Sequence, residues 1–130
     1  MNIIGKSLFA AAALVASATP VFAAEVKPFD RAAFAAAQAA NRPILVDVKA
    51  GWCPVCASQA RTIKATIPAA AYDKLVIFEL SYDNQKPEWQ AFGVRKQATL
   101  IAFRGKTQIG RLEFVTDKAQ IQNLLAQAVR

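Results

Sequence analysis

Cys53 and Cys56 are the only cysteines in the chain, and two residues separate them. They lie where an apolar run passes into a predicted helix, with Pro54 at a position that suits the first turn. Unpaired backbone N–H groups at a helix N-terminus favour thiolate over thiol, so we expect Cys53 to be a nucleophile. Cys56, one turn further on, is expected to be more buried and to attack a mixed disulfide formed at Cys53. The spacing therefore predicts thiol–disulfide exchange.

The same spacing also occurs in half of a zinc site and in structural disulfides. A closed zinc site takes four ligands, whereas this chain has no histidine and no third cysteine, which disfavours zinc within one subunit. A bridge across three residues restrains little of the unfolded chain, which disfavours a purely structural role. We therefore assign no metal ligand and expect no cofactor beyond the Cys53–Cys56 disulfide itself.

The elements that must hold this pair alternate between helices and strands. Short runs rich in β-branched residues predict strands, and the two that are apolar nearly throughout are typical of strands buried on both faces in a parallel sheet. In chain order, we predict a helix over 31–40, a strand over 44–48, a helix over 53–65, a strand over 75–80, a short helix or turn over 87–92, hairpin strands over 99–103 and 108–114, and a helix capped by Thr116 that runs to about Val129.

This order predicts an α/β fold with a central mixed sheet of four to five strands flanked by helices. The cysteine pair then lies just beyond the carboxyl end of a parallel strand, where catalytic loops gather in such sheets. Phe29 and Phe34 are spaced as an apolar staple around the Asp30 cap of the first helix.

The first 23 residues differ in character from the rest. A short positive stretch with Lys6 precedes an apolar run over 7–18, which is too short to span a bilayer, and Val21 and Ala23 suit a signal peptidase. We therefore expect a signal peptide over 1–23 and a single domain over 24–130. The alternative, an uncleaved membrane anchor, requires a longer apolar run. Export to the periplasm or outside the cell places the cysteines in an oxidising compartment.

Composition narrows the classes of partner. With 55% hydrophobic and 19% charged residues, the chain is not a disordered protein. Removing Lys6 with the signal peptide leaves 15 basic and nine acidic residues, a net charge of +6. The basic residues are scattered rather than clustered on one segment, which disfavours nucleic acid as a partner. We expect a monomer.

The segment from Val46 to Cys56, VDVKAGWCPVC, resembles the thioredoxin-like thiol–disulfide oxidoreductases, and the resemblance covers essentially the whole mature chain. An acidic residue lies six positions before the first cysteine in that family, and Asp47 stands there. The resemblance implies a thioredoxin-like fold, substrate proteins with disulfides or thiols, and proton transfer assisted by Asp47. The implied substrate-binding residues are Trp52, Pro54, Val55, Gln97, Ala98 and Thr99.

Two positions depart from the family pattern. Ala98 stands where the family has a cis-proline that faces the cysteines, and a cis bond before a non-proline residue costs about 2.5–4 kcal/mol, so we predict a trans Gln97–Ala98 peptide. Glu79 stands where thioredoxin has a lysine near the buried aspartate. If Glu79 and Asp47 face each other, repulsion and burial raise the pKa of one of them, and Asp47 then suits a proton acceptor for Cys56. Alternatively, Glu79 points to solvent and Asp47 is a hydrogen-bonded polar residue of the core.

The chain looks most similar to small periplasmic thioredoxins and to the C-terminal domain of DsbD-type proteins, which receive electrons from a membrane thiol carrier. No histidine lies between the cysteines, which favours a reductant or electron carrier over an oxidant. A reductant in an oxidising compartment needs a membrane electron donor. The alternative function is a non-catalytic module that binds a soft metal such as Cu(I) or a protein partner.

Overall fold

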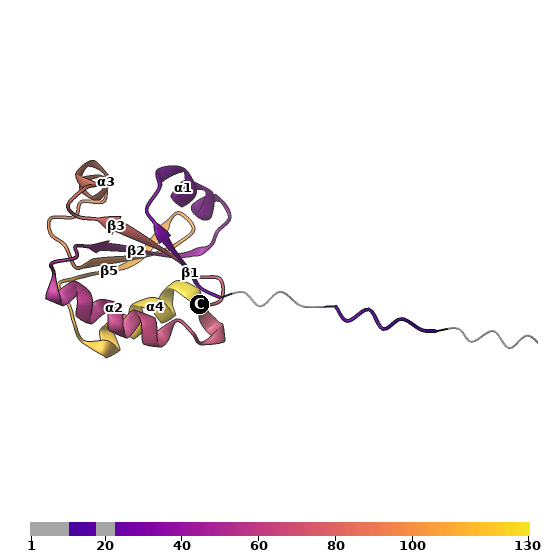
Figure 1. Ribbon diagram of the computed structural model, residues 1–130. Helices are drawn as coiled ribbons and strands as arrows, with labels where there is room; N and C mark the ends of the chain where they lie inside the picture. Colours follow the sequence, from indigo (N-terminus) through magenta and orange to yellow (C-terminus); the bar gives the residue numbers. More distant parts are fainter. Residues whose placement is uncertain (1–10, 18–22) are drawn as a thin grey trace, which may run out of the picture.

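A five-stranded sheet separates two layers of helices in the computed structural model, which describes residues 11–17 and 23–130 (Figure 1). The strand order is β1-β3-β2-β4-β5, with β1, β3 and β2 parallel and the last two antiparallel to their neighbours. The elements are β1 (Glu25–Pro28), α1 (Arg31–Ala39), β2 (Pro43–Lys49), α2 (Pro54–Thr66), a 3-10 turn (Ala70–Tyr72), β3 (Val76–Ser81), α3 (Lys86–Ala91), β4 (Thr99–Arg104), β5 (Thr107–Glu113) and α4 (Lys118–Val129). This arrangement is the predicted mixed α/β sheet.

Most of the predicted signal peptide, 1–10 and 18–22, lies outside the described residues, so its existence and cleavage stay predictions. Residues 11–17 have no regular secondary structure. Within the ranges that the structure describes, no helix combines the length and apolar character needed to cross a bilayer.

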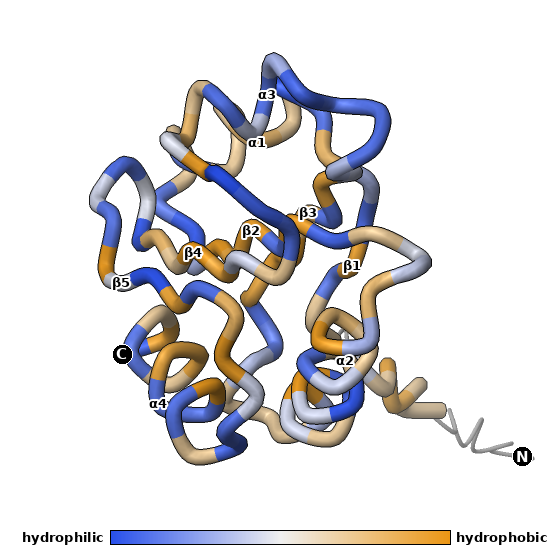
Figure 2. Tube along the Cα trace, turned by 90° about the vertical axis from the view of Figure 1, so that its left-hand side faces the viewer, coloured by the Kyte–Doolittle hydropathy of each residue, from blue (hydrophilic) through white to orange (hydrophobic). Residues whose placement is uncertain are grey.

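Strand β2 lies at the centre of the sheet and positions the site. It pairs in parallel with β3 and antiparallel with β4, and its five inner residues are all buried. Hydrophobic residues are concentrated on β2, β3 and β4 in the middle of the molecule (Figure 2). Helices α1 and α3 cover one face of the sheet, and α2 and α4 cover the other (Figure 1). A strand with both faces covered accounts for the continuous apolar run that predicted it.

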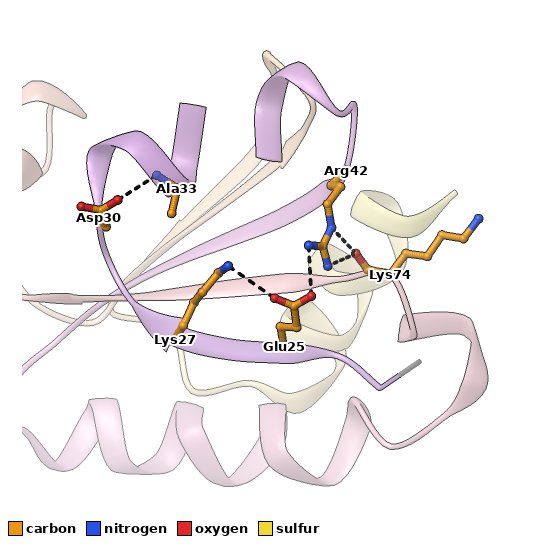
Figure 3. Close-up of polar contacts among 6 residues, drawn as sticks. All are labelled: Glu25, Lys27, Asp30, Ala33, Arg42 and Lys74. Carbon is orange, nitrogen blue, oxygen red and sulfur yellow. Dashed lines mark hydrogen bonds and ion pairs between the residues drawn. The ribbon is translucent and has the colours of Figure 1, made fainter. Parts of the chain in front are cut away.

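Strand β1 was not predicted from the sequence. It has four residues, three of them exposed, and therefore lacks the apolar run that reveals a buried strand. Long-range contacts hold it in register with β3: the guanidinium of Arg42 donates to Glu25 Oε1 at 3.1 Å and to the Lys74 carbonyl at 3.2 Å (Figure 3). These two contacts span 17 and 32 positions of the chain, so no local pattern reports them.

The helix starts were predicted to within a residue or two. Asp30 caps α1, with its carboxylate accepting from the Ala33 N–H at 2.8 Å, and the rings of Phe29 and Phe34 lie 5.6 Å apart, as predicted. The predicted cap of the last helix was wrong by one residue. Asp117, rather than Thr116, caps α4 and accepts from the Gln120 N–H at 3.0 Å. A carboxylate satisfies the free N–H groups of a first turn as well as a hydroxyl does, so either residue fits the pattern.

Candidate active site

The cysteine pair lies where β2 leads into α2. Cys53 is the N-cap residue of α2, in an extended conformation, and Pro54 follows in the first turn. The Cys56 N–H donates to Cys53 Sγ at 3.1 Å, so the sulfur occupies the position of a capping oxygen. A thiolate at this place receives a hydrogen bond and the favourable field of the helix N-terminus, and this geometry suits Cys53 for nucleophilic attack.

Both cysteines are buried to the same degree, with Cys53 3% and Cys56 4% exposed. The expectation that Cys56 is the more buried was therefore wrong. Ala50 and Ala98 pack against the pair, and Tyr82, directly after β3, packs against the same cluster. Ala98, in the loop before β4, belongs to the cluster that buries both cysteines, and the spacing of the cysteines does not report that loop.

The Cys56 thiol holds its proton firmly. Burial raises the pKa of Cys56 to about 11, and the hydrogen bond with Cys53 and the charge of Asp47 act in the same direction. A thiol with that pKa is almost entirely protonated at neutral pH. Attack by Cys56 on a disulfide at Cys53 therefore requires a base that removes its proton.

Asp47 has the properties of such a base. It lies on β2, is 5% exposed, and burial raises its pKa to about 6, while the charge of Lys49 acts downward and that of Glu79 upward. Its carboxylate lines a cavity of about 330 Å³ between the sheet and α2, together with Lys49 and Glu79. A carboxylate that titrates near neutral pH beside a space that can hold water is suited to accept a proton.

Glu79 lies beside Asp47, as one of the two alternatives predicted, because the two residues are register partners on neighbouring parallel strands. Glu79 also forms an ion pair with Lys49, at 2.6 Å from Nζ to Oε2. Lys49 follows Asp47 by two residues on β2, so the two side chains are on the same face of the sheet. Although burial alone lowers it, the pKa of Lys49 is raised on balance by the hydrogen bond with Glu79 and by nearby acidic charge. A permanent positive charge therefore lies beside the two acids.

Trp52 stands at the rim of the site. The residue is 59% exposed, and its indole N–H donates to both carboxylate oxygens of Asp83, at 3.0 and 3.1 Å. Pro54 is exposed and Val55 is half-buried in the cysteine cluster. These three predicted substrate-binding residues flank Cys53 and leave accessible surface around it.

The loop before β4 has the trans Gln97–Ala98 peptide that the sequence predicts, and no cis peptide bond occurs in the described part of the chain. Ala98 adopts a left-handed conformation, with φ at +61°. Its N–H donates to the Val48 carbonyl at 2.8 Å and its carbonyl accepts from the Phe114 N–H at 2.9 Å. The backbone groups of Ala98 are therefore occupied within the protein.

Ala98 and Thr99 are two of the predicted substrate-binding residues, and their side chains are buried, at 0% and 1% exposed. The cause is the packing of Ala98 on the cysteines and the pairing of Thr99 with Val48 at the start of β4. Gln97 differs, because it is half-buried and its backbone N–H and carbonyl make no hydrogen bond to any described residue. Directly beside Ala98, Gln97 thus has backbone groups free to pair with a substrate.

Sequence reasoning missed two residues of the site, Gln59 and Asp83, and favoured a solvated lysine over a groove residue for Lys49. Gln59 had a detectable signal, since it lies in the stripe of Cys56 and Ile63 on α2, where an amphipathic helix carries apolar residues. It is fully buried, and its amide nitrogen reaches the Ala98 carbonyl at 3.0 Å. Lys49 and Asp83 are ordinary charged residues in the sequence, and only their three-dimensional partners identify them.

Comparisons with known proteins agree with this geometry. The family model described as Thioredoxin matches residues 25–127. A thioredoxin from Alicyclobacillus acidocaldarius subsp. acidocaldarius is 30% identical over 90 residues, which cover 69% of this chain and 85% of that protein. Among solved structures, Trxlp from Edwardsiella tarda EIB202 has a TM-score of 0.75 at 38% identity, over 78% of this chain and 98% of that one. The Malassezia sympodialis thioredoxin Mala s 13 shares the fold at 18% identity, with a TM-score of 0.72 over 86% and 96%.

Proposed function

The chain belongs to the thioredoxin family, and from that premise we propose that this thiol–disulfide oxidoreductase is exported and acts as a reductant or electron carrier. The observation that carries the proposal is the cysteine pair at the start of α2, with Cys53 Sγ accepting the Cys56 N–H at 3.1 Å. Export rests on the predicted signal peptide over 1–23. Periplasmic or secreted proteins with disulfides are the substrates.

The first step is attack of the Cys53 thiolate on a substrate disulfide. A bond forms between Cys53 Sγ and one substrate sulfur, the substrate S–S bond breaks, and the other substrate sulfur leaves as a thiolate that takes a proton. Gln97 supports this step, because its unpaired backbone groups can form hydrogen bonds with an extended substrate segment. Trp52, Pro54 and Val55 surround Cys53 and supply the remaining contact surface.

The second step releases the substrate. Asp47 lies close enough for its charge to raise the pKa of Cys56; it accepts the proton of Cys56, and the Cys56 thiolate attacks Cys53 Sγ. The Cys53–Cys56 disulfide forms, the mixed disulfide breaks, and the second substrate sulfur leaves as a thiolate. Two electrons have then passed from the protein to the substrate disulfide. Because the pKa is near 6 for Asp47 and near 11 for Cys56, this proton transfer is uphill. The Cys56 thiolate must therefore attack before the proton returns to it.

The oxidised protein must be reduced before the next cycle. A dithiol on a membrane electron donor supplies two electrons by the same exchange in reverse, and its own sulfurs become a disulfide. The absence of histidine between Cys53 and Cys56 removes one group that stabilises the thiolate in strong oxidants, which supports the reducing direction. We propose that the protein works as a monomer.

The test is the equilibrium reduction potential of Cys53–Cys56, measured on residues 24–130 in thiol buffers of graded ratio by the mass shift on alkylation. A value near or below about −230 mV supports a reductant, and one near −120 mV identifies an oxidant and contradicts the proposal. Mass spectrometry of the secreted protein from cells that express the full chain tests export. A precursor that keeps residues 1–23 contradicts cleavage.

The alternative function, binding of a soft metal such as Cu(I) by the two thiols, has a separate test. Within 11–17 and 23–130, no three histidine, cysteine or acidic side chains group closely enough to hold a metal ion, and Cys53 and Cys56 are the ligands that this alternative uses. Metal content of protein purified without chelator distinguishes the two functions. Stoichiometric copper together with a cysteine pair that does not cycle favours the binding module.

A further inference from the structure

One buried side chain connects the helix that carries the cysteines to the loop that faces them. Gln59 lies three residues after Cys56 on α2, so the two side chains are on the same side of the helix. Its Nε2 donates to the Ala98 carbonyl and to the Val115 carbonyl, both at 3.0 Å. Three segments that are distant in the sequence, namely α2, the start of β4 and the connection from β5 to α4, meet at this one amide.

The orientation of this amide is fixed by its surroundings. The two hydrogens of Nε2 match the two carbonyl oxygens, whereas the opposite orientation sets Gln59 Oε1 against both of them. Oε1 itself is buried and has no partner among the described residues. An unpaired amide oxygen in the interior destabilises the fold, and the two hydrogen bonds donated by Nε2 offset this cost.

Those bonds hold a strained piece of backbone. Ala98 and Phe114 both have left-handed conformations, with φ at +61° and +58°, which side chains other than glycine adopt at a cost. Such residues persist only where the surroundings determine their conformation. The Ala98 carbonyl accepts from both Gln59 Nε2 and the Phe114 N–H, so both of its lone pairs are engaged. Gln59 therefore supplies one of the hydrogen bonds that keep Ala98 left-handed.

The conformation of Ala98 affects the reaction through its neighbours. Its side chain packs on Cys53 and Cys56, and the preceding residue, Gln97, has the free backbone groups at this edge of the site. Rotating Ala98 out of the left-handed region turns the Gln97 peptide and moves those groups. We propose that Gln59 is a positioning residue for substrate binding, which holds the Ala98 loop in the conformation that presents Gln97 beside Cys53. This inference rests on the thiol–disulfide exchange described above.

The variant Gln59→Met tests the inference, because it keeps an unbranched side chain of similar volume and removes both donors. The assay measures KM and kcat for insulin disulfides, with dithiothreitol to reduce the protein after each turnover. We expect KM to rise about fivefold to tenfold, on the scale of one lost hydrogen bond, with kcat within about twofold of wild type. Thr62→Val is the matched control, since Thr62 is a buried polar residue of the same helix, and its KM should not change.

A double variant separates positioning from general loosening of the fold. Glycine adopts the left-handed conformation without the cost that alanine bears, so in an Ala98→Gly background the loop depends less on Gln59. Gln59→Met should then raise KM by less than it does with Ala98 present. An equal rise in both backgrounds, or an unchanged KM in Gln59→Met, overturns the inference.

Two further results keep the outcomes distinct. If Gln59→Met does not fold, Gln59→Asn retains the amide but is too short to reach both carbonyls, and the same criterion applies to its KM. Wild-type protein that does not reduce insulin at all contradicts the proposed function itself. Wild-type activity with an unaltered KM in the Gln59 variants contradicts only the role of Gln59.

Discussion

The buried carboxyl of Asp47 should make the protein less stable as the pH rises, and Asp47→Asn should remove this effect. The pKa of Asp47 is about 6 in the folded protein and has an ordinary value of 3.8 in the unfolded chain. Between these values the folded state binds more protons than the unfolded state, so the free energy of unfolding falls as the pH rises through this window. Stability from this group is therefore complete below about pH 3.8 and lost above about pH 6.

The size of the effect follows from the same two values. Their difference, at 1.36 kcal/mol for each pKa unit, corresponds to about 3 kcal/mol of lost stability at pH 7.5. Asp47 is 5% exposed, so solvent screening reduces this figure little. Asparagine has the same shape and no charge, and it avoids the loss, although its NH₂ group also needs partners in the interior. We expect the variant to exceed wild type in stability by up to about 3 kcal/mol at pH 7.5 and by close to zero at pH 4.

Urea unfolding of the reduced protein, followed by tryptophan fluorescence at pH 4, 5, 6 and 7.5, measures this difference. Asp73→Asn is a suitable control, because it makes the same substitution before β3, at the opposite end of the sheet from the cysteines. A difference between Asp47→Asn and wild type that does not grow between pH 4 and pH 7.5, or that changes in favour of wild type, refutes the reasoning.

Three further predictions concern the same site. In disulfide reduction, kcat/KM of wild type should rise with pH through about 6, and Asp47→Asn should lack this rise because Cys56 then has no base; an unchanged pH profile excludes the proton transfer. Lys49→Gln should move that rise to higher pH, since it removes the positive charge that lowers the pKa of Asp47, and a shift to lower pH contradicts this electrostatic role. Ala98→Gly should raise the free energy of unfolding by about 1 kcal/mol, because it removes the strain of the left-handed conformation. Ala98→Pro should lower it by about 3 kcal/mol, because proline lacks the N–H bonded to Val48 and cannot adopt φ at +61°. Urea unfolding measures both changes, and equal stability of the two variants contradicts a strained, hydrogen-bonded Ala98.

The sequence predicted the elements whose pattern is local. The apolar run over 44–48 and the cap at Asp30 were confirmed, because burial on both faces and capping each leave a short signature. Strand β1 left none, since it is an exposed edge strand held by Arg42 from a distant turn. Once the strands over 44–48 and 75–80 are predicted to be parallel neighbours, Glu79 can be placed beside Asp47, because the parallel register pairs these two residues.

The chemistry of the site depends on contacts that no local pattern contains. The sequence led to the view that repulsion and burial together raise the pKa of one of the two acids. In the structure both raise the pKa of Asp47, with burial the larger cause, while Lys49 neutralises Glu79 in an ion pair of 2.6 Å. A positive charge at this place moderates the pKa of Asp47 and keeps it near 6, which is within reach of neutral pH.

The absence of proline at position 98 changes what holds the loop beside the cysteines. A proline ring has no N–H and fixes φ near −65°, so its backbone conformation is built into the residue. Ala98 has neither constraint, and its N–H bonds to Val48 while its carbonyl accepts from Gln59 and Phe114. The order of the loop is thus distributed over hydrogen bonds from β2, α2 and the end of β5. It follows that the substrate edge at Gln97 depends on the integrity of those three elements, and that a substitution in any of them, distant from both sulfurs, is able to alter how the protein binds its substrates.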